Sequence, residues 1–398
     1  MMETWRTIRL GSACTTNSAT YSPKEKWEFV NYLDTGNITN NRINSIQYID
    51  VESEKLPSRA RRKVKTNSII YSTVRPNQRH FGIIKSQPDN FLVSTGFAVI
   101  DVKPEILDAD YLYYVLTQDS IVEKLHAIAE QSTSAYPSIK SSDIEDLEIE
   151  VPDLATQKKI AGILGELDRK AKQNAEINKN LEAQAQAYFI DQFVVNADPT
   201  WPQGTLSDLG TVVGGGTPSK KHPEYYCEHG IPWITPRDLS VDKSKFISHG
   251  ENDISDLGFS NSSATKMPEG TILFSSRAPI GYIAIASNTV TTNQGFKSVI
   301  PNINVGTAFV YYFLKQALPT IEGMASGSTF KEISGSGMKS VHAIIPDNET
   351  LHKFSEFCKP LFKQQAVMEA ENRRLSGIRD ALLPKLMSGE IDVSDIDL

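Results

Sequence analysis

Few residues of this chain fall into patterns that could carry catalysis. Adenine methyltransferases use an Asp/Asn-Pro-Pro-Tyr/Phe segment, and the sequence contains no Pro-Pro dipeptide. Several nucleases use Pro-Asp followed by Asp or Glu, any residue and Lys. Pro88-Asp89 with Asp101-Val-Lys103 fits this pattern, and so does Pro152-Asp153 with Asp168-Arg-Lys170. Two matches show how permissive the pattern is. We interpret both as chance and predict no catalytic residue.

Two further segments have residue types suited to ligand binding. His222, Cys227 and His229 could be metal ligands, but their spacing fits no zinc pattern and no fourth ligand is evident, so we predict no metal. The segment from Val213 to Lys221 reads VGGGTPSKK, which lacks the G-x-x-x-x-G-K-[ST] spacing of a phosphate loop. We interpret it as a flexible turn whose donors could touch a DNA backbone.

Positive charge is concentrated in two acid-free stretches. The sequence contains no Asp or Glu from Lys55 to Pro88 or from Gly270 to Ile321, although the formal net charge is -7. A basic face can neutralise phosphates, while Arg, Asn and Gln read base edges. A solvated surface is the alternative, because most charge runs are only that. The residues that we predict to contact DNA are Arg59, Arg61, Arg62, Lys63, Arg75, Arg79 and Lys85 in the first half and Lys220, Lys221, Arg237, Arg277 and Lys297 in the second.

Composition sets the broad class. The chain has 398 residues, of which 39% are hydrophobic and 22% charged, enough for two or three globular domains. Its three cysteines are odd in number and far apart, which favours a reducing compartment, the cytoplasm. No apolar run approaches the roughly 20 residues that span a bilayer, and the N-terminus lacks the apolar core of a secretory signal. We therefore expect no membrane partner.

The sequence also repeats itself. Five motifs recur in the same order, each separated from its copy by about half of the chain. They are Trp5 with Leu10-Gly11 and Trp201 with Leu209-Gly210, Ser72–Pro76 and Ser275–Pro279, Gly96-Phe97 and Gly295-Phe296, Tyr111–Leu116 and Phe309–Leu314, and Pro152-Asp153 and Pro346-Asp347. Each copy begins with mixed strand and helix signals and ends with a long segment rich in good helix formers. This order predicts two copies of one α+β unit.

The two helical segments carry hydrophobic residues at alternating steps of four and three, in the same register. Such spacing favours a coiled coil, and a helix of about 36 residues would form a spacer about 54 Å long. Two ordinary amphipathic helices are the alternative. The second segment contains Pro360 where the first has Glu166, so that helix is expected to start late or bend. The predicted seam comprises Ile160, Leu164, Leu167, Asn178 and Leu181 in the first segment and Phe354, Leu361, Met368, Asn372, Leu375 and Leu382 in the second.

Several segments resemble one known family, the specificity subunits of type I restriction–modification systems. The resemblance spans nearly the whole chain. Its most specific parts are Ala187–Val194, Leu382–Ile391, Gly215–Ser219 and Ile231–Leu239; the first copy has Thr15–Ala19 in place of Gly-Gly-Thr-Pro-Ser. The resemblance implies that each recognition domain reads one half of a split DNA target, and that the two helices pack antiparallel and set the gap. It also implies modification subunits, two of them, docked on the helices, together with restriction subunits.

The resemblance assigns S-adenosylmethionine, Mg and ATP to those partner subunits and no cofactor to this chain. The expected fold is α+β, with two pseudo-repeated α/β target recognition domains separated by two long helices that form an antiparallel coiled coil. The expected boundaries are residues 1–152 and 198–346 for the recognition domains, and residues 153–197 and 347–398 for the helical regions, the latter with an acidic tail. Two other functions remain open: an enzyme that modifies or cleaves DNA alone, and a coiled-coil protein scaffold.

Overall fold

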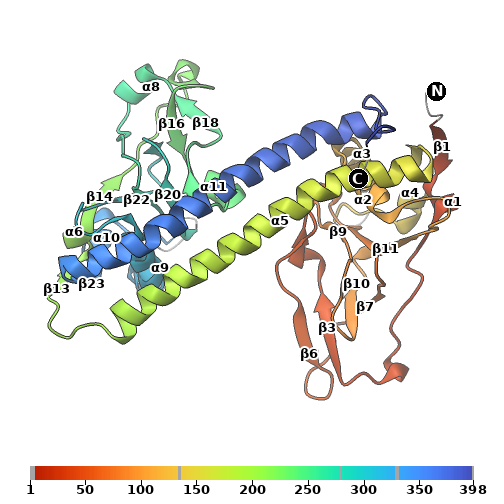
Figure 1. The fold of residues 1–398 in the computed structure, drawn as a ribbon, viewed down its shortest axis with the longest axis horizontal. Helices are drawn as coiled ribbons and strands as arrows, with labels where there is room; N and C mark the ends of the chain where they lie inside the picture. The colour runs from red at the N-terminus through yellow and green to blue at the C-terminus, as the bar shows by residue number, and fades with distance from the viewer. Residues whose placement is uncertain (1–4, 133–135, 278, 328–330, 397–398) are drawn as a thin grey trace. The chain divides into compact units, whose positions relative to one another are not determined.

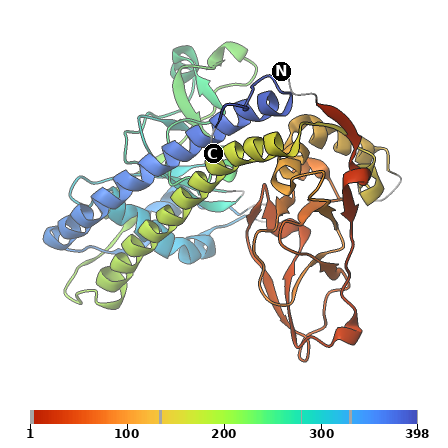
Figure 2. The same cartoon turned by 45° about the vertical axis from the view of Figure 1, so that its right-hand side comes forward.

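The computed structural model describes residues 5–132, 136–277, 279–327 and 331–396. Ala278 of the repeated Ser275–Pro279 motif, the first four residues of the first domain and the last two residues of the acidic tail lie outside these ranges. The chain divides into two compact units, Met1–Lys170 with Leu375–Leu398 and Ala171–Arg374. Figures 1 and 2 show their elements in two views.

The first unit contains two four-stranded sheets. One has the order β2-β11-β8-β9 and the other β6-β3-β10-β7. Strands β8 and β11 are buried at every position but Val102, because they lie in the core under helices α2 (Ala109–Thr117) and α3 (Asp119–Glu130). The strand bounds are β2 Cys14–Thr16, β3 Phe29–Leu33, β6 Gln47–Asp50, β7 Ala60–Lys63, β8 Ile69–Ser72, β9 Phe81–Ile83, β10 Phe91–Ser94 and β11 Phe97–Val102.

The second unit contains the corresponding sheets, with orders β14-β22-β19-β20-β17 and β15-β18-β16-β21. Helix α9 (Thr307–Met324) packs on the larger sheet as α2 and α3 do in the first unit. The strand bounds are β14 Gly210–Gly214, β15 Tyr226–Cys227, β16 Ile231–Ile234, β17 Phe246–Ile247, β18 Asn252–Ile254, β19 Ile272–Ser276, β20 Ile280–Ala286, β21 Thr291–Thr292 and β22 Lys297–Pro301.

Equivalent hydrogen bonds occur within each of the two units. Leu10 N donates to Leu147 O at 2.8 Å, and Leu206 N donates to Val341 O at 2.8 Å. A short antiparallel pair also recurs, β1 (Arg6–Arg9) with β12 (Glu148–Val151) and β13 (Gln203–Thr205) with β23 (His342–Ile344). The prediction of two copies of one α+β unit is confirmed.

Two long helices follow the globular parts, α5 (Leu154–Ile190) and α11 (Asn348–Met387). The repeated Pro-Asp motif begins both. Asp153 Oδ1 accepts from Thr156 N at 2.9 Å, and Asp347 Oδ1 accepts from Thr350 N at 2.9 Å, so each aspartate caps its helix. The expected late start at Pro360 is wrong: α11 begins at Asn348 and remains helical through that residue.

The helices run antiparallel in each unit, side by side in both views (Figures 1 and 2). In the second unit Tyr188 packs on Phe354 with ring centroids 5.5 Å apart, and Asn174 Nδ2 donates to Asn372 Oδ1 at 3.0 Å. In the first, Arg379 Nη1 donates to Asp168 Oδ1 at 2.9 Å. Of the predicted seam, Ile160, Leu164, Leu181 and Phe354 are buried, and Leu167, Asn178, Leu361, Met368, Asn372, Leu375 and Leu382 are half-buried.

Polar residues interrupt the seam in the second unit. The repeat aligns Asn178 with Asn372, but the antiparallel direction places Asn178 opposite Gln365 and Asn372 opposite Asn174. Gln365 Nε2 donates to Asn178 O at 3.2 Å. Asn174 and Gln365 are buried, so these amides favour one register of the helices over the alternatives.

Candidate nucleic-acid interface

Three of the seven cations predicted in the first copy are paired with acids from other elements. Lys63 forms an ion pair with Glu25, and its Nζ lies 5.1 Å from the centre of the Trp27 ring. Arg79 Nη2 lies 2.5 Å from Asp119, and Lys85 Nζ lies 2.7 Å from Asp110. The stretch is free of acids in sequence but not in space, so its positive field is weaker than the sequence indicates.

Arg59, Arg61 and Arg62 lie at or next to β7, which forms an edge of its sheet. Arg59 is exposed near Asp34, and within the described residues Arg61 makes no ion pair. Arg62 is different: its Nε atom is buried and has no hydrogen-bond partner in the part of the chain that the structure describes. Burial lowers the pKa of Arg62.

Arg75 and Arg79 flank a 3-10 turn, Pro76–Gln78, and both have left-handed backbones, with φ of 47° and 55°. Such conformations are costly for residues other than glycine and occur often at binding sites. Arg75 is exposed, and its guanidinium carbon lies 5.4 Å from the centre of the Tyr136 ring. The turn also exposes Asn77 and Gln78. The turn presents a cation and two amides beside the ring of Tyr136, which suits contact with nucleic acid.

In the second copy a single carboxylate neutralises two predicted cations. Arg277 Nη1 lies 3.5 Å from Glu332 Oε2, and Lys297 Nζ lies 3.5 Å from Glu332 Oε1. Ser276 Oγ donates to Gly295 O at 3.0 Å, which ties the end of β19 to the turn before β22.

Two of the three glycines of the VGGGTPSKK segment serve packing. A Cβ on Gly215 would lie 2.0 Å from Asn293 O, and one on Gly216 would lie 2.4 Å from Ala264 N, so only glycine fits at either position. Gly216 also accepts from Trp233 Nε1 at 2.9 Å. The expected flexible turn is therefore a packed one.

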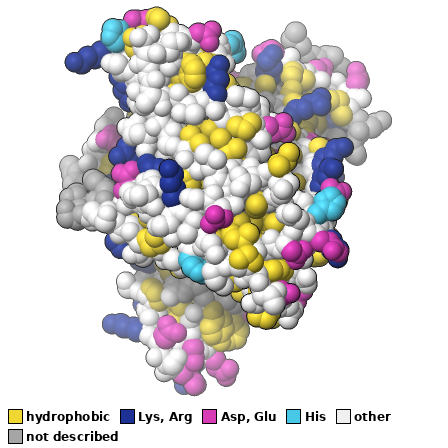
Figure 3. All heavy atoms as spheres, turned by 90° about the vertical axis from the view of Figure 1, so that its left-hand side faces the viewer, with side chains coloured by type: hydrophobic (Ala, Val, Ile, Leu, Met, Phe, Trp, Pro, Cys, Tyr) yellow, Lys and Arg dark blue, Asp and Glu magenta, His cyan; other side chains and the backbone are white. Residues whose placement is uncertain are grey.

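Beyond this segment, Lys220 and Lys221 are exposed and make no ion pair within the described residues, while Arg237 lies 3.6 Å from Glu251. On the face drawn in Figure 3, lysines and arginines are scattered in small groups with acidic side chains between them. The lysines and arginines drawn there do not merge into one continuous basic surface.

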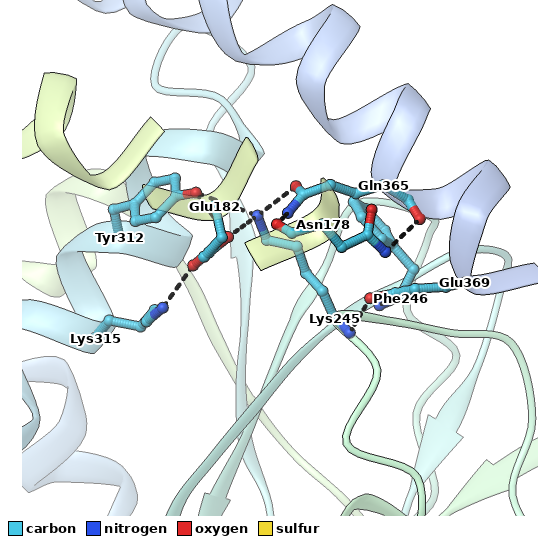
Figure 4. A network of polar contacts seen from close by, with 8 residues as sticks. All are labelled: Asn178, Glu182, Lys245, Phe246, Tyr312, Lys315, Gln365 and Glu369. Atoms are coloured by element: carbon cyan, nitrogen blue, oxygen red, sulfur yellow. Dashed lines mark hydrogen bonds and ion pairs between the residues drawn. The ribbon is translucent and has the colours of Figure 1, made fainter. Parts of the chain in front are cut away.

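A buried polar network joins the second globular part to both helices (Figure 4). Lys245 Nζ donates to Glu182 Oε2 of α5 at 2.5 Å and to Gln365 Oε1 of α11 at 2.9 Å. Lys315 Nζ donates to Glu182 Oε1 at 2.5 Å. Glu369 of α11 accepts from the backbone N–H groups of Lys245 and Phe246 at 2.8 and 3.0 Å.

Burial and charge shift the pKa values in this network. Burial lowers the pKa of Lys245 to about 8, against the opposing charge of Glu182. Burial alone would raise the pKa of Glu182, but the charges and hydrogen bonds of Lys245 and Lys315 outweigh it and bring that pKa to about 2. Glu182 is therefore ionised at neutral pH.

The first unit has a corresponding attachment. Tyr114 Oη donates to Asp168 of α5 at 2.8 Å, just as Tyr312 Oη donates to Glu182 of α5 at 2.9 Å. Each carboxylate also binds a cation, Arg379 in one case and Lys245 in the other. Burial and the neighbouring carboxylate raise the pKa of both tyrosines, so both hydroxyls remain donors.

Comparison with known proteins decides the family. The model of the "Type I restriction modification DNA specificity domain" matches residues 2–183 and again residues 199–376. The chain belongs to the type I restriction–modification DNA specificity family. The family is one of DNA recognition, not of catalysis.

Two relatives and one solved structure illustrate the membership. The specificity subunit of the type I restriction enzyme HindI of Haemophilus influenzae is 27% identical over 98% of this chain and 100% of its own. That of MjaIX from Methanocaldococcus jannaschii is 39% identical over 42% of this chain and 41% of its own. A crystal structure of a type I restriction–modification S subunit from M. genitalium shares the fold, with a TM-score of 0.61 and 17% identity over 96% of both chains.

Among the other candidate ligand residues, His222 has structural partners. His222 Nδ1 lies 2.9 Å from Glu224 Oε1, and its ring stacks on Tyr225. Within the described ranges no group of three or more His, Cys, Asp or Glu residues could hold a metal ion, and no helix there is long and apolar enough to cross a membrane. Cys14, Cys227 and Cys358 form no disulfide.

Sequence reasoning missed the attachment of the specificity domains to the helices. The sequence does contain a trace of this attachment, because a Tyr-Tyr pair occurs in both copies, as Tyr113-Tyr114 and Tyr311-Tyr312. In the sequence alone this pair indicates only the repeat. Lys245 carried no signal, since no motif or period sets it apart from other lysines.

Proposed function

We propose that this chain is the DNA-specificity subunit of a type I restriction–modification complex, and that each recognition domain reads one half of a split duplex target. The duplication carries the proposal: two specificity domains occur in one chain, with four strands of one sheet in the same order and equivalent backbone hydrogen bonds. We assign the domains to residues 1–152 and 198–346. The helical regions, 153–197 and 347–398, set the gap between the two half-sites.

Partners follow from that role. Two modification subunits dock on the helices and use S-adenosylmethionine to methylate adenine, and restriction subunits use ATP and Mg to translocate and cut. This chain contributes no cofactor. The complex acts in the cytoplasm, where its DNA substrate lies and where thiols such as those of Cys14 and Cys358 stay reduced.

Co-purification with the companion modification subunit tests the proposal. The pair should methylate adenine, and sequencing of the modified DNA should show one split motif with a fixed gap. Modification at one continuous motif would contradict the reading by two domains. Absence of both methylation and DNA binding by the pair would contradict the function itself and favour a protein scaffold.

A further inference from the structure

Glu332 is the one acidic residue that forms ion pairs with two of the cations assigned to DNA in the second specificity domain, within the described residues. Its carboxylate lies 3.5 Å from both Arg277 and Lys297, and Ser276 Oγ lies 3.4 Å from its Oε1 atom. The side chain is 36% exposed, so it lies at the surface where a ligand of these cations would approach.

Backbone hydrogen bonds fix the position of residue 332 beside these cations. Arg277 and Glu332 form an antiparallel bridge, and Ile333 N donates to Ser276 O at 3.1 Å. Glu332 also exchanges two backbone hydrogen bonds with Ser326, at 2.9 and 3.2 Å. A phosphate that reaches Arg277 or Lys297 therefore meets Glu332 beside them and cannot avoid it by a shift of the chain.

We propose that Glu332 is a specificity-determining residue, which keeps Arg277 and Lys297 from binding the phosphates of arbitrary DNA. This inference rests on the proposed function. Contact with phosphates is independent of sequence and supplies most non-specific affinity. A carboxylate beside these cations opposes that contact by like-charge repulsion. The repulsion weakens binding to every DNA, but a target whose bases add further contacts stays bound, whereas unrelated DNA that depends on phosphate contacts dissociates.

Burial of Lys297 distinguishes this arrangement from an ordinary surface ion pair, which contributes little. The Lys297 side chain is 17% exposed, so its ammonium group needs a nearby anion. Glu332 supplies that anion in the free protein. Without the carboxylate, a DNA phosphate would take its place.

The first specificity domain has no carboxylate at the position that corresponds to Glu332. Ile139 N donates to Thr73 O as Ile333 N does to Ser276 O, and Val74 bridges Ser138 as Arg277 bridges Glu332. Ser138 thus occupies the position of Glu332 and carries no charge. Control of non-specific binding by a carboxylate at this position is confined to the second domain.

The test compares full-length variants in complex with the modification subunit. Binding to a labelled duplex of about 30 base pairs and arbitrary sequence is measured over a series of salt concentrations. The variants are E332Q, E332D and the double variant E332Q/K297Q. E349Q is the matched control, because Glu349 pairs with Lys353 on α11 at 2.6 Å and lies on a different element from the cations assigned to DNA.

E332Q should bind arbitrary DNA on the order of 10-fold more tightly, the value of one charge-assisted contact. Its plot of log affinity against log salt should steepen by about 0.9 for each additional phosphate that the variant neutralises. E332D and E349Q should bind as the parent does, and the gain in E332Q/K297Q should be smaller than in E332Q, because only Arg277 is then released. Sequencing of DNA methylated by the E332Q complex should show added modification outside the parent motif.

Equal affinity and salt slope for E332Q and the parent, with methylation of the parent's split motif unaltered, would overturn this inference and leave the proposed function standing. An equal gain in E349Q would also overturn it, since the effect would then follow net charge. Failure of the parent complex to bind or methylate DNA would overturn both.

Discussion

Lys245 binds Glu182 through a contact of 2.5 Å between Nζ and Oε2, and the lysine side chain is only 6% exposed. Its ammonium group also lies 3.8 Å from the centre of the Phe362 ring and 4.6 Å from that of Tyr311. Within the second unit this contact joins the segment before β17 to helix α5. A specificity domain must keep a fixed orientation on its helices if the gap between half-sites is to be fixed, and this buried pair supplies part of that rigidity.

Replacement of Lys245 by methionine should destabilise the second unit by about 3 kcal/mol, because Glu182 would be deprived of a partner while remaining largely buried. Chemical denaturation measures the change. Lys243, two residues away and exposed, provides the control: K243M should change stability by no more than about 0.5 kcal/mol. Equal stability of K245M and the parent would show that the pair contributes nothing net.

The same network predicts a dependence on acid. The folded pKa of Glu182 is about 2, against an ordinary value of 4.5, so its contribution is complete above pH 4.5 and is lost as pH falls towards 2. E182Q lacks this contribution. The difference in unfolding free energy between parent and E182Q should be level from about pH 7 to pH 5, near 3 kcal/mol, and shrink below. A difference that stays constant down to pH 3 would contradict the lowered pKa of Glu182 in the folded protein.

Gly215 should not tolerate a side chain. A methyl group there would lie 2.0 Å from Asn293 O and 2.4 Å from Thr292 O, both backbone atoms. G215A should therefore lose about 2–3 kcal/mol of stability by overpacking. Gly214 is the neighbouring control, since a Cβ there meets nothing within 4 Å, and G214A should stay within about 1 kcal/mol of the parent. Similar melting temperatures for the two variants would contradict the packed turn.

Arg61 and Arg62 together should contribute to DNA binding in the first domain. Their joint replacement by alanine should weaken binding and reduce the salt slope by about 0.9 for each phosphate that is no longer neutralised. Lys124 of α3, exposed in the same unit, serves as the control for charge. An unchanged salt slope in the double variant would remove both residues from the interface.

Local patterns in the sequence predicted much of this architecture. The recurring Pro-Asp and Tyr-Tyr motifs report the duplication, because the same helix cap and the same hydroxyl–carboxylate contact occur in both copies. Hydrophobic residues at steps of four and three predicted the two long helices, because this periodicity depends only on residues that are close along the chain. Pro360 misled, since a proline at an exposed helix position is tolerated where the rest of the helix is held by packing.

Contacts distant in sequence escaped prediction. Glu332 meets Arg277 across 55 residues, and Lys245 meets Glu182 across 63, so neither pair leaves a periodic trace. The acid-free stretches therefore overstated the positive field. Asn178 contacts Gln365 because the two helices are antiparallel. The periodicity of each helix alone does not predict this pairing.

In the proposed function each domain reads its own half of a split target. This arrangement is tested most directly by replacing residues 198–346 with the matching region of the HindI specificity subunit and sequencing the DNA methylated by the chimeric complex. One half of the motif should stay as in the parent, the other half should change, and the gap between them should be kept. Change in both halves, or in neither, would contradict independent reading by two domains.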